Sequence, residues 1–489
     1  MFIYFAEWCI IRTFAQYFAV VEKKDIIIIG TGLGGLECGM LLSKRGYSVL
    51  LLEAQAQPGG CMQSYSRRGS HYDTGLHYVG GLREGEALHD TFKELGLLDL
   101  PWHHLDPEAF DKVTIGGETF SFHEGFDEFA YAMSQRFPKE KAGLQRYVDM
   151  LRHCSDANVM HANVNAWQWM HETFQDELLI SVLSGTSLKM ELRKETLPLF
   201  TFAHGNSSFI ESSWRLQGPG NMLVEKLVEG IRNNGGEVVC NAQVTELIET
   251  DGKITAAVCS NGERYEADTF ISNAHPATTC NLVKDSKIMK GLYRRRIGSL
   301  ENTCGMFTCS LKLKEDALPY FNHNKFIYSD ADVWGLPERC DCSGVLVSAR
   351  VPEDGKPFSQ IDLLTPMSWE DCERWQDTTI GRRGNDYKDL KTQMAGRCIA
   401  LAETQLPGLQ DAIEETYCST PLTYRDYNLA PQGTAYGIRK DCNAPLMTIL
   451  TPRTPIPNLL LTGQNIMVHG LHGVTYTALY TVREVRGGA

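Results

Sequence analysis

The clearest hydrophobic pattern of the chain lies near its start. Four apolar residues, Ile26 to Ile29, lead into a glycine-rich turn, and a second apolar run follows at Val49 to Leu52. Short apolar runs bounded by turn residues are typical of buried strands. Between them, Leu33 to Lys44 has apolar residues at helical spacing. The side of this helix that we expect to be buried carries Leu36, Met40 and Leu41. The pattern therefore predicts a strand, a helix and a second strand.

Further elements are predicted along the rest of the chain. Helical patterns cover Glu124 to Arg136 and Lys139 to Cys154. Strand-like runs at Met306 to Leu313 and Gly344 to Val351 precede a helix near Trp369 to Leu406. The last segments are a strand at Leu459 to Thr462, a turn at 463–465 and a helix at Gly473 to Val485. The middle of the chain thus predicts an antiparallel sheet capped by helices.

The turn between the first two predicted strands carries a G-x-G-x-x-G fingerprint. Its glycines are Gly30, Gly32 and Gly35, and Leu33 and Gly34 lie between them. The first allows a sharp turn, the second a close approach of a pyrophosphate, and the third close packing of the helix. The helix start offers N–H groups and partial positive charge to phosphates. Glu53 ends the second strand, where a carboxylate accepts hydrogen bonds from ribose hydroxyls. Together these parts predict a Rossmann-type dinucleotide site.

NAD and FAD share this fingerprint, and the segment that follows favours FAD. Gly59 and Gly60 lie just after the acid, as in flavoproteins that resemble the amine oxidases and phytoene desaturases. The sequences P-G-G-C at Pro58, H-Y-D-T-G-L-H-Y-V-G at His71 and L-T-G-Q-N at Leu461 resemble the retinol saturases. Phytoene desaturases usually have an arginine after the double glycine, whereas this chain has Cys61, as the saturases do. The chain is therefore similar to the retinol saturase, carotenoid isomerase and phytoene desaturase family.

The resemblance implies an α/β fold with a discontinuous, GR2-like FAD-binding domain and a second, α+β substrate domain of antiparallel sheet and helices. The FAD domain is expected to comprise residues 24–95, 216–280 and 430–489, and the substrate domain residues 96–215 and 281–429. Residues 1–23 form an apolar N-terminal extension. The sequence Q-G-P-G-N at Gln217 departs from the Pro-x-Gly-Gly of relatives, and much of the substrate domain has no recognisable match.

The resemblance also implies roles for residues in three separate segments. Val244 lies beside the adenine, and Asn273 follows the strand that completes the FAD domain. Gly463 and Gln464 approach the flavin phosphate and ribitol, while Gly473 and Val474 begin the helix that faces the pyrimidine end of the ring. The predicted cofactor site comprises these residues with Gly30, Gly32, Leu33, Gly34, Gly35, Glu53, Gly59, Gly60 and Cys61. We expect Cys61 to pack near FAD rather than to react.

The implied function is that of an FAD-dependent oxidoreductase acting on a lipophilic isoprenoid or polyene, which it saturates or isomerises at a carbon–carbon double bond. The flavin carries the hydride or electrons, and the protein aligns the chain and excludes water. Candidate proton-transfer residues near the flavin are His77, Tyr78, Tyr436 and His472, with His469 and Tyr476 beside them. For each, packing or hydrogen bonding to the flavin is the commoner role.

Three alternatives remain open at this point. The chain could be a desaturase-like dehydrogenase that passes electrons to oxygen or quinone, or an amine oxidase. The latter usually needs an aromatic cage and a lysine near the flavin, and neither is identifiable in the sequence. A flavin-binding protein without catalysis is the third. Because a second G-x-G-x-x-G with a following acid is not evident, NAD(P)H, if it is the donor, is expected to bind transiently as reductant.

The amino-acid composition argues against some classes of binding partner. A formal net charge of -13 argues against nucleic acid, which requires basic patches. The 15 cysteines lack a repeating spacing, and the pair Cys340 and Cys342 has no matching second pair, so no metal site is predicted. Cysteine usage of this kind fits a reducing cytoplasm.

The first residues form an apolar stretch, Met1 to Val21, that contains Glu7 and Arg12. Two charges make a membrane span costly. Three interpretations stay open: an interfacial helix on the inner face of a membrane, a segment packed on the protein, and an over-extended translation start. The first makes the protein cytoplasmic and peripheral, in contact with a membrane surface.

Overall fold

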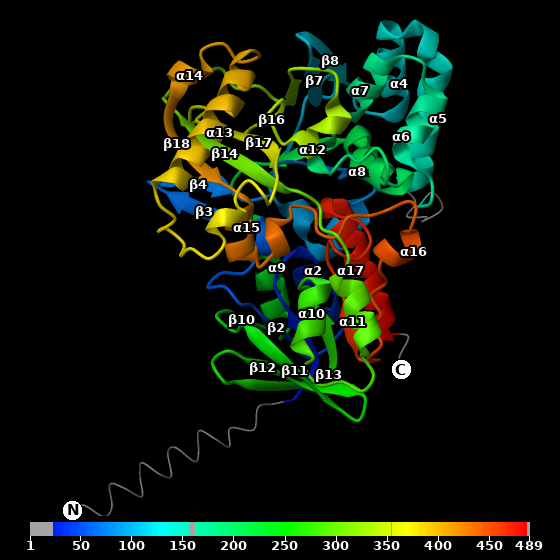
Figure 1. The fold of residues 1–489 in the computed structure, drawn as a ribbon, viewed down its shortest axis with the longest axis vertical. Helices are drawn as coiled ribbons and strands as arrows, with labels where there is room; N and C mark the ends of the chain where they lie inside the picture. The colour runs from blue at the N-terminus through cyan, green and yellow to red at the C-terminus, as the bar shows by residue number, and fades with distance from the viewer. Residues whose placement is uncertain (1–22, 156–161, 354, 487–489) are drawn as a thin grey trace, which may run out of the picture.

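The computed structural model describes residues 23–155, 162–353 and 355–486. The apolar stretch from Met1 to Val21 lies outside these ranges. Two seven-stranded sheets dominate the described residues, and Figure 1 shows one sheet in the lower part of the molecule and the other in the upper part. Among the described helices, none combines the length and the apolarity that crossing a bilayer requires.

The lower sheet is built around parallel strands that come from three parts of the chain. Its parallel strands run in the order β10 (Glu237–Val239), β2 (Val49–Leu52), β1 (Lys24–Ile29), β13 (Arg264–Ser272) and β19 (Leu459–Leu461). The antiparallel strands β12 (Lys253–Cys259) and β11 (Val244–Thr250) extend it. Ile29 is in register with Leu52 and with Ser272, which is in register with Leu461. The carboxyl ends of these strands therefore meet at one edge.

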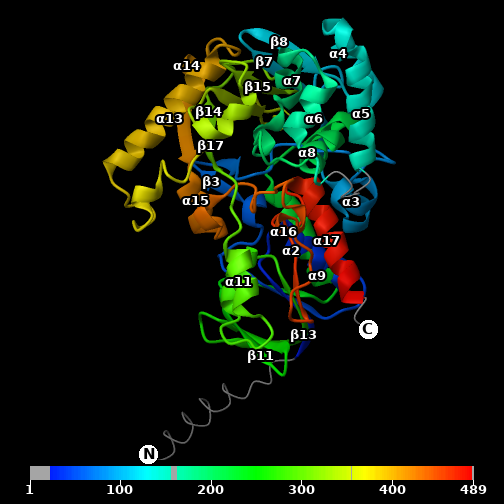
Figure 2. The same ribbon diagram turned by 45° about the vertical axis from the view of Figure 1, so that its right-hand side comes forward.

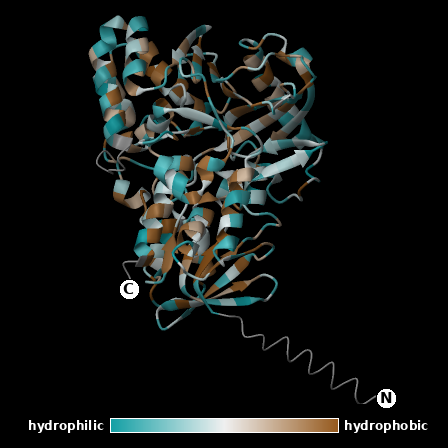
Figure 3. Ribbon diagram, turned by 180° about the vertical axis from the view of Figure 1, so that it is seen from behind, coloured by the Kyte–Doolittle hydropathy of each residue, from teal (hydrophilic) through white to brown (hydrophobic). Residues whose placement is uncertain are grey.

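Alternation of side chains gives this sheet two buried faces. Ile26 and Ile28 pack toward α2 (Leu33–Ser43), α9 (Asn221–Asn233) and α17 (Gly470–Arg486), with α3 (His89–Leu95) at the edge of the same core. Ile27 and Ile29 pack on the opposite side, toward α10 (Pro276–Leu282) and α11 (Gly291–Gly298). Figure 2 shows α17 alongside α2, and in Figure 3 the hydrophobic strands of this sheet lie between the helices.

The upper sheet is antiparallel apart from one parallel pair, β7 with β15, among its described strands. Its order is β18 (Ile413–Ser419), β14 (Gly305–Leu313), β17 (Gln360–Met367), β16 (Gly344–Ala349), β15 (Asn324–Tyr328), β7 (Asp111–Ile115) and β8 (Glu118–Phe122). One face packs against α13 (Asn385–Glu403). A second core includes α4 (Phe126–Arg136), α5 (Lys141–Ser155), α6 (Ala166–Thr173), α7 (Glu177–Ser184) and α8 (Leu199–Glu211). The predicted fold class is confirmed.

Smaller elements complete the fold around the two sheets. A hairpin joins β3 (Ser64–Arg67) to β4 (Ser70–Asp73), and β9 (Ser213–Leu216) pairs with both β5 (Val79–Gly80) and β6 (Trp102–His104). Short helices are α12 (Leu336–Arg339), α14 (Leu409–Ala412), α15 (Pro421–Asn428) and α16 (Pro445–Thr448). The 3-10 turns used below are η1 (Gly60–Met62), η5 (Ser187–Lys189) and η7 (Glu373–Trp375).

Two predictions about helices are wrong. A continuous helix from Trp369 to Leu406 does not form, because α13 begins only at Asn385. The preceding segment turns at Gly381 and Gly384, whose backbones have positive φ of 77° and 90°, and the η7 turn buries Trp375 in the core. The prediction that α2 has one buried side is also wrong. Every residue of α2 is buried, because the sheet, α9 and α17 surround it.

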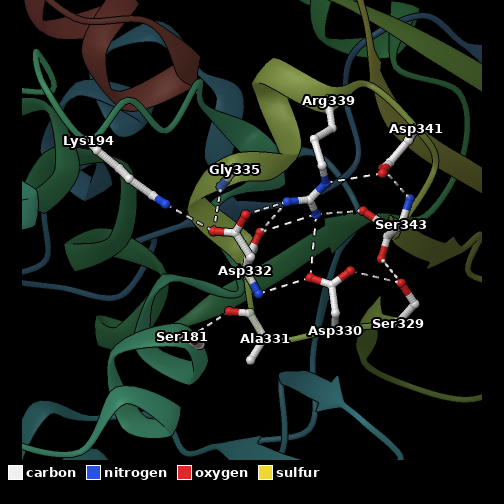
Figure 4. A network of polar contacts seen from close by, with 10 residues as sticks. All are labelled: Ser181, Lys194, Ser329, Asp330, Ala331, Asp332, Gly335, Arg339, Asp341 and Ser343. Carbon is white, nitrogen blue, oxygen red and sulfur yellow. Dashed lines mark hydrogen bonds and ion pairs between the residues drawn. The ribbon is translucent and has the colours of Figure 1, made fainter.

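A polar network around Arg339 secures the loop that precedes α12 (Figure 4). The Arg339 guanidinium binds Asp341 at 3.1 Å and the Ser343 hydroxyl at 2.9 Å, and it also pairs with Asp332. Lys194 Nζ reaches Asp332 at 3.1 Å. This contact ties the segment that follows η5 to the loop that precedes α12.

Candidate functional site

Three distant segments meet at the carboxyl edge of the lower sheet. The Gly30 N–H donates to the Leu52 carbonyl at 2.8 Å, and the Asn273 N–H donates to the Ile29 carbonyl at 2.9 Å. The Thr462 N–H donates to the Ser272 carbonyl at 2.9 Å, which brings the turn at Gly463 to the same place. The residues predicted for the cofactor therefore come together from the first, middle and last parts of the chain.

The backbone segments that meet at this edge lie so close together that several positions have no room for a side chain. A Cβ added to Gly35 would lie 2.2 Å from the Gly30 carbonyl oxygen, so the third glycine allows α2 to pack against the end of β1. A Cβ added to Gly34 would lie 3.0 Å from the backbone of Gly463 and from the Asn273 side chain. Glycines from two segments and Asn273 thus form one crowded cradle.

The start of α2 is open to an anion. Gly32 is its N-cap and gives no side-chain cap, and the first turn, which begins with Leu33 and Gly34, carries no acidic residue. The unpaired N–H groups and the helix dipole favour a phosphate there. Gly59 pairs with Gly32 in an isolated bridge, and Gly60 lies beside it at the start of η1. These residues fit the phosphates of a dinucleotide.

Glu53 lies at the end of β2, beside the same turn. Its carboxylate accepts from the Thr31 N–H and the Gln55 N–H at 2.9 Å each, and from the Thr31 hydroxyl. The Ala242 N–H donates to the Glu53 carbonyl at 2.7 Å, so the strand that begins with Val244 runs close to Glu53. The structure therefore brings Val244 to the acid end of the cradle.

Cys61 lies in η1 and packs against the core behind the cradle. The Asn428 amide donates to its sulfur at 3.2 Å. Burial raises the pKa of the Cys61 thiol to about 11, so the thiol is neutral near pH 7. A neutral thiol is a poor nucleophile, and this agrees with a packing role.

The last segment supplies the remaining predicted residues. Gly463 and Gln464 form the turn after β19, and α17 begins at Gly470, a turn earlier than predicted. Gly473 and Val474 lie in its first turns, and Val474 packs in the core shared with α2. The helix start thus lies close to the cradle, in the chain segment that follows the Gly463 turn.

Lys440 is a buried cation that the sequence did not reveal. Its ammonium donates to the carbonyls of Asn465 at 2.8 Å, Thr448 at 3.1 Å and Ile466 at 3.2 Å. Burial lowers the pKa of Lys440 to about 7. A lysine in a loop between short elements carries no sequence signal of such a role. Lys440 therefore braces the segment that follows the Gly463 turn, and it is only partly charged near pH 7.

His77 and Tyr78 are neighbours in sequence but lie in different surroundings. His77 is half-buried and lines a cavity of about 20 Å³, enough for a water molecule, with Asp73, Arg215, Arg350 and Asp362. Burial lowers the pKa of His77. The Tyr78 hydroxyl instead donates to Asp111 at 2.9 Å. Burial, followed by the charge of Asp111, raises the pKa of Tyr78 well above 10.

His472 lies in the first turn of α17, and Tyr436 comes from an earlier loop that packs near it, but the two make separate contacts. The Tyr436 hydroxyl donates to the Leu188 carbonyl at 2.6 Å, and its ring lies 4.8 Å from that of His469. His472 faces His204 of α8 at a ring distance of 5.2 Å. His472 Nδ1 and both nitrogens of His204 are buried without a hydrogen-bond partner among the described residues. Burial lowers the pKa of His472 to about 4, so it is neutral near pH 7.

Lys189 and Asp111 join Tyr78 in a group that sequence reasoning missed. Lys189 Nζ donates to the Tyr78 hydroxyl at 3.2 Å, and the Asn324 amide donates to Asp111 at 2.8 Å. These residues are far apart in the chain and stand in no common motif. The four predicted catalytic residues therefore do not form one cluster, and η5 connects two of them, since Tyr436 contacts Leu188 and Tyr78 contacts Lys189.

Comparison with known proteins agrees with this geometry. The family described as NAD(P)-binding Rossmann-like domain matches residues 28–95, which contain the cradle and Glu53. All-trans-retinol 13,14-reductase of Macaca fascicularis is 26% identical over 94% of this chain and 85% of its own length. Prolycopene isomerase 2 of an Oncidium hybrid is 23% identical over 85% of this chain and 75% of its own.

A solved structure of putrescine oxidase bound to putrescine shares the fold. Its TM-score is 0.64 at 15% identity, over 95% of this chain and 99% of the other. The similarity to the retinol saturases that the sequence predicts is thus confirmed, because relatives named all-trans-retinol 13,14-reductase match nearly the whole chain.

Proposed function

We propose that this protein is an FAD-dependent oxidoreductase that saturates or isomerises a carbon–carbon double bond of a lipophilic isoprenoid or polyene. The observation that carries the proposal is the glycine cradle at the uncapped start of α2, in a chain similar over 94% of its length to a retinol reductase. The relatives named as retinol reductase and as prolycopene isomerase carry the names of polyenes, which supports this substrate class.

The residues at the sheet edge fit FAD. The backbone from Gly30 to Gly35, with Gly59 and Gly60, would hold the pyrophosphate, and Glu53 the adenosine ribose. Val244 would lie beside the adenine, and Gly463 and Gln464 beside the flavin phosphate and ribitol. The start of α17, with Gly473 and Val474, would face the pyrimidine end of the ring, where a positive helix end stabilises the reduced form. When bound, the flavin supplies the hydride.

The chain's own residues would bind the polyene and exclude water. The upper part of the molecule has a large aromatic and aliphatic core, which contains Phe110 and Phe122 and against which Phe209 packs. Apolar side chains of this kind would favour a lipophilic ligand through burial of its surface. They would also keep water from the reacting bond, which protects a reactive intermediate from side reactions.

A second candidate function is amine oxidation. The observation that favours it is the fold shared with putrescine oxidase. The two candidate functions differ in the oxidation state of the flavin that reacts with the substrate. An amine oxidase would use the oxidised flavin, and a polyene saturase or isomerase would use the reduced flavin. Putrescine added to the oxidised holoenzyme in the absence of oxygen should bleach the flavin bands if the protein is an amine oxidase. All-trans-retinol or a carotenoid added to the dithionite-reduced holoenzyme should restore the bands if the protein saturates a double bond, or should itself change in isomer composition while the flavin stays reduced if the protein isomerises one. If neither compound gives either result, our proposal is contradicted.

We further propose that NAD(P)H, where it is the electron donor, binds transiently at the flavin face. The described residues contain one sheet with the parallel dinucleotide-binding arrangement, and its cradle is assigned to FAD. Anaerobic mixing with NADH and with NADPH tests this. We expect slow or non-saturating reduction of the flavin, whereas tight binding in the absence of FAD would contradict the proposal.

A lipophilic substrate also supports contact with a membrane surface, on the cytoplasmic face. Cosedimentation of the full chain with neutral and with anionic vesicles tests this contact. The net charge of -13 predicts weaker binding to the anionic vesicles. The same charge supports the expectation that nucleic acid is not a partner.

A further inference from the structure

Two cysteine thiols lie side by side on the upper sheet. Cys309 of β14 and Cys418 of β18 are direct partners in the antiparallel register of these two strands. Directly opposite residues of an antiparallel pair project from the same face of the sheet, with Cβ atoms about 4.5–5.5 Å apart. The Cys309 thiol donates a hydrogen bond to the Cys418 sulfur, so the two sulfur atoms are in contact. The pairing of the strands thus brings together two thiols that are far apart in the sequence.

The two thiols differ in how far they are exposed to solvent. Cys309 is fully buried, because β14 lies between β18 and β17 and its side chain packs in the core that includes α13. Cys418 is only partly buried, because β18 is the outermost strand of the sheet in the part of the chain that the structure describes. A small reagent that comes from solvent therefore meets Cys418 before it meets Cys309.

A cationic side chain of α13 lies near both sulfur atoms. Figure 1 shows α13 beside β14 and β18, and Lys391 of this helix interacts electrostatically with Cys418 and with Cys309. A cation and a donated hydrogen bond both stabilise a thiolate. The hydrogen bond from Cys309, together with the charge of Lys391, lowers the pKa of the Cys418 thiol in spite of burial. The same hydrogen bond, together with burial, raises the pKa of the Cys309 thiol well above its usual range.

Other cysteines have one of these properties without the rest. Cys398 donates a hydrogen bond to Cys342, but both residues are buried in the core against α13. Cys240, which follows β10, is partly exposed, but burial raises the pKa of its thiol. Reactive cysteines are typically partly exposed and lie near a positive charge. Cys418 has both properties, and it also has a second thiol in contact with it.

We propose that Cys418 and Cys309 form a peroxide-sensitive pair that closes to a reversible disulfide, an inference that does not depend on the proposed function. The Cys418 thiolate attacks one oxygen of hydrogen peroxide, the O–O bond breaks, and Cys418 becomes a sulfenic acid. The hydroxide that leaves takes up a proton and becomes water. The Cys309 sulfur then attacks the sulfenic acid, an S–S bond forms, and a second water leaves with the Cys309 proton. Two thiols thus lose two electrons, and one peroxide becomes two waters.

The disulfide would fasten the outermost strand of the upper sheet to its neighbour. Thr420, two residues after Cys418, is the N-cap of α15, and Asn428 of α15 donates to the Cys61 sulfur beside the cradle. Oxidation would therefore act on the strand that leads into a helix in contact with the cradle. A thiol reductant would reverse it, as is usual for disulfides that respond to oxidants in a reducing compartment.

The test uses the purified full chain, first reduced with dithiothreitol and then freed of it. A small molar excess of hydrogen peroxide is added, the remaining thiols are alkylated under denaturing conditions, and the peptides are mapped by mass spectrometry without reduction. We expect one linked pair of peptides, joined through Cys309 and Cys418 and lost after dithiothreitol, while Cys240 is recovered as a free thiol. A linkage between Cys342 and Cys398 in its place, or free thiols at both Cys309 and Cys418, would overturn the proposal.

Variants test which thiol reacts first. In Cys309→Ala the second thiol is missing, so a sulfenic acid at Cys418 should persist and be labelled by dimedone. The label should be lost in Cys418→Ala, whereas Cys240→Ala, the control at a partly exposed thiol, should still form the disulfide. Melting temperatures report whether each variant folds, and the peptide map of the unmodified chain does not depend on them. Dimedone that labels Cys240 and leaves Cys418 unlabelled in folded Cys309→Ala would contradict the assigned roles.

Discussion

At the scale of single residues, Glu37 shows how the fold controls a carboxyl group. It is fully buried in α2, where one carboxyl oxygen accepts from the Thr475 hydroxyl of α17 at 2.7 Å and the other has no partner among the described residues. Burial raises its pKa from about 4.5 to about 8. Glu37 is therefore a neutral acid near pH 7, and it holds the two helices that border the cradle.

Glu37 should make the stability of the protein depend on pH. Between pH 4.5 and 8 the folded protein keeps a proton that the unfolded chain releases, so stability falls as pH rises through this window. Glu37→Gln removes this titration and keeps the shape of the side chain. At pH 8 the variant should be more stable than the wild type by a few kcal/mol, at about 1.4 kcal/mol per pKa unit. Melting curves at pH 5 and pH 8 measure this, and an equal pH dependence in both proteins would contradict it.

Glu53 should decide how tightly FAD is held. Glu53→Ala removes the carboxylate proposed to bind the ribose hydroxyls, and hydrogen bonds to a charged group contribute about 1.5–3 kcal/mol. We expect FAD to dissociate roughly tenfold to a hundredfold more readily, as measured by flavin fluorescence on dilution. Glu246→Ala, a surface carboxylate of β11, is the control. Unchanged flavin retention in Glu53→Ala would exclude the ribose role.

At the scale of elements, the close contact of α2 with β1 depends on Gly35. Its substitution by alanine would push a methyl group against the Gly30 carbonyl oxygen, 2.2 Å from an ideal Cβ position. Helix and strand would have to separate, and overpacking of this kind typically costs about 1–3 kcal/mol. We expect Gly35→Ala to lower the melting temperature and to lose FAD.

Gly396 in α13 provides the matched control for that substitution. It lies within a helix, and an added Cβ would meet nothing within 4 Å. Because glycine is unfavourable in a helix interior by about 1 kcal/mol relative to alanine, Gly396→Ala should be neutral or stabilising. Similar destabilisation of both variants in chemical denaturation would argue against a specific role for the Gly35 contact.

Which elements could be predicted from the sequence follows from how local their signals are. The strand at Ile26, the helix at Leu33 and the strand at Val49 are consecutive and strongly apolar, and each forms close to its predicted limits. The segment after Trp369 has apolar residues at mixed spacing, and its glycines at positive φ break the expected helix. The start of the helix is therefore set by the glycine turns and by the burial of Trp375 in the core, and neither can be read from the spacing of apolar residues.

At the scale of the whole molecule, the sequence predicts the nucleotide cradle far better than it predicts the buried polar group of Tyr78, Asp111 and Lys189. Most of the cradle follows from the glycine fingerprint, the acid and a family resemblance in three segments, and these residues do meet at one edge. The group of Tyr78, Asp111 and Lys189 does not follow from any motif. Its members lie in separate segments, and only the folding of β7 and η5 against β5 brings them together.

The division into a discontinuous FAD domain and a substrate domain remains a prediction, as do the roles of the individual site residues. The arrangement of the two sheets explains why both parts are needed. The lower sheet presents the cradle, while β7, β8 and α8 build an aromatic core in the upper part. The segment before α17 contacts both parts, because His469 packs against Tyr436, whose hydroxyl donates to the Leu188 carbonyl of η5.

The mass and the isomer composition of a polyene after incubation with the protein would show whether the protein reacts with it. All-trans-retinol and a carotenoid would each be incubated, without oxygen, with dithionite-reduced holoenzyme and with reduced free FAD as control. We predict a product heavier by two hydrogens, formed in step with flavin reoxidation, or an isomer of unchanged mass that needs the reduced enzyme. Polyenes that leave the reaction unchanged in mass and in isomer composition, while the flavin stays reduced, would contradict the account.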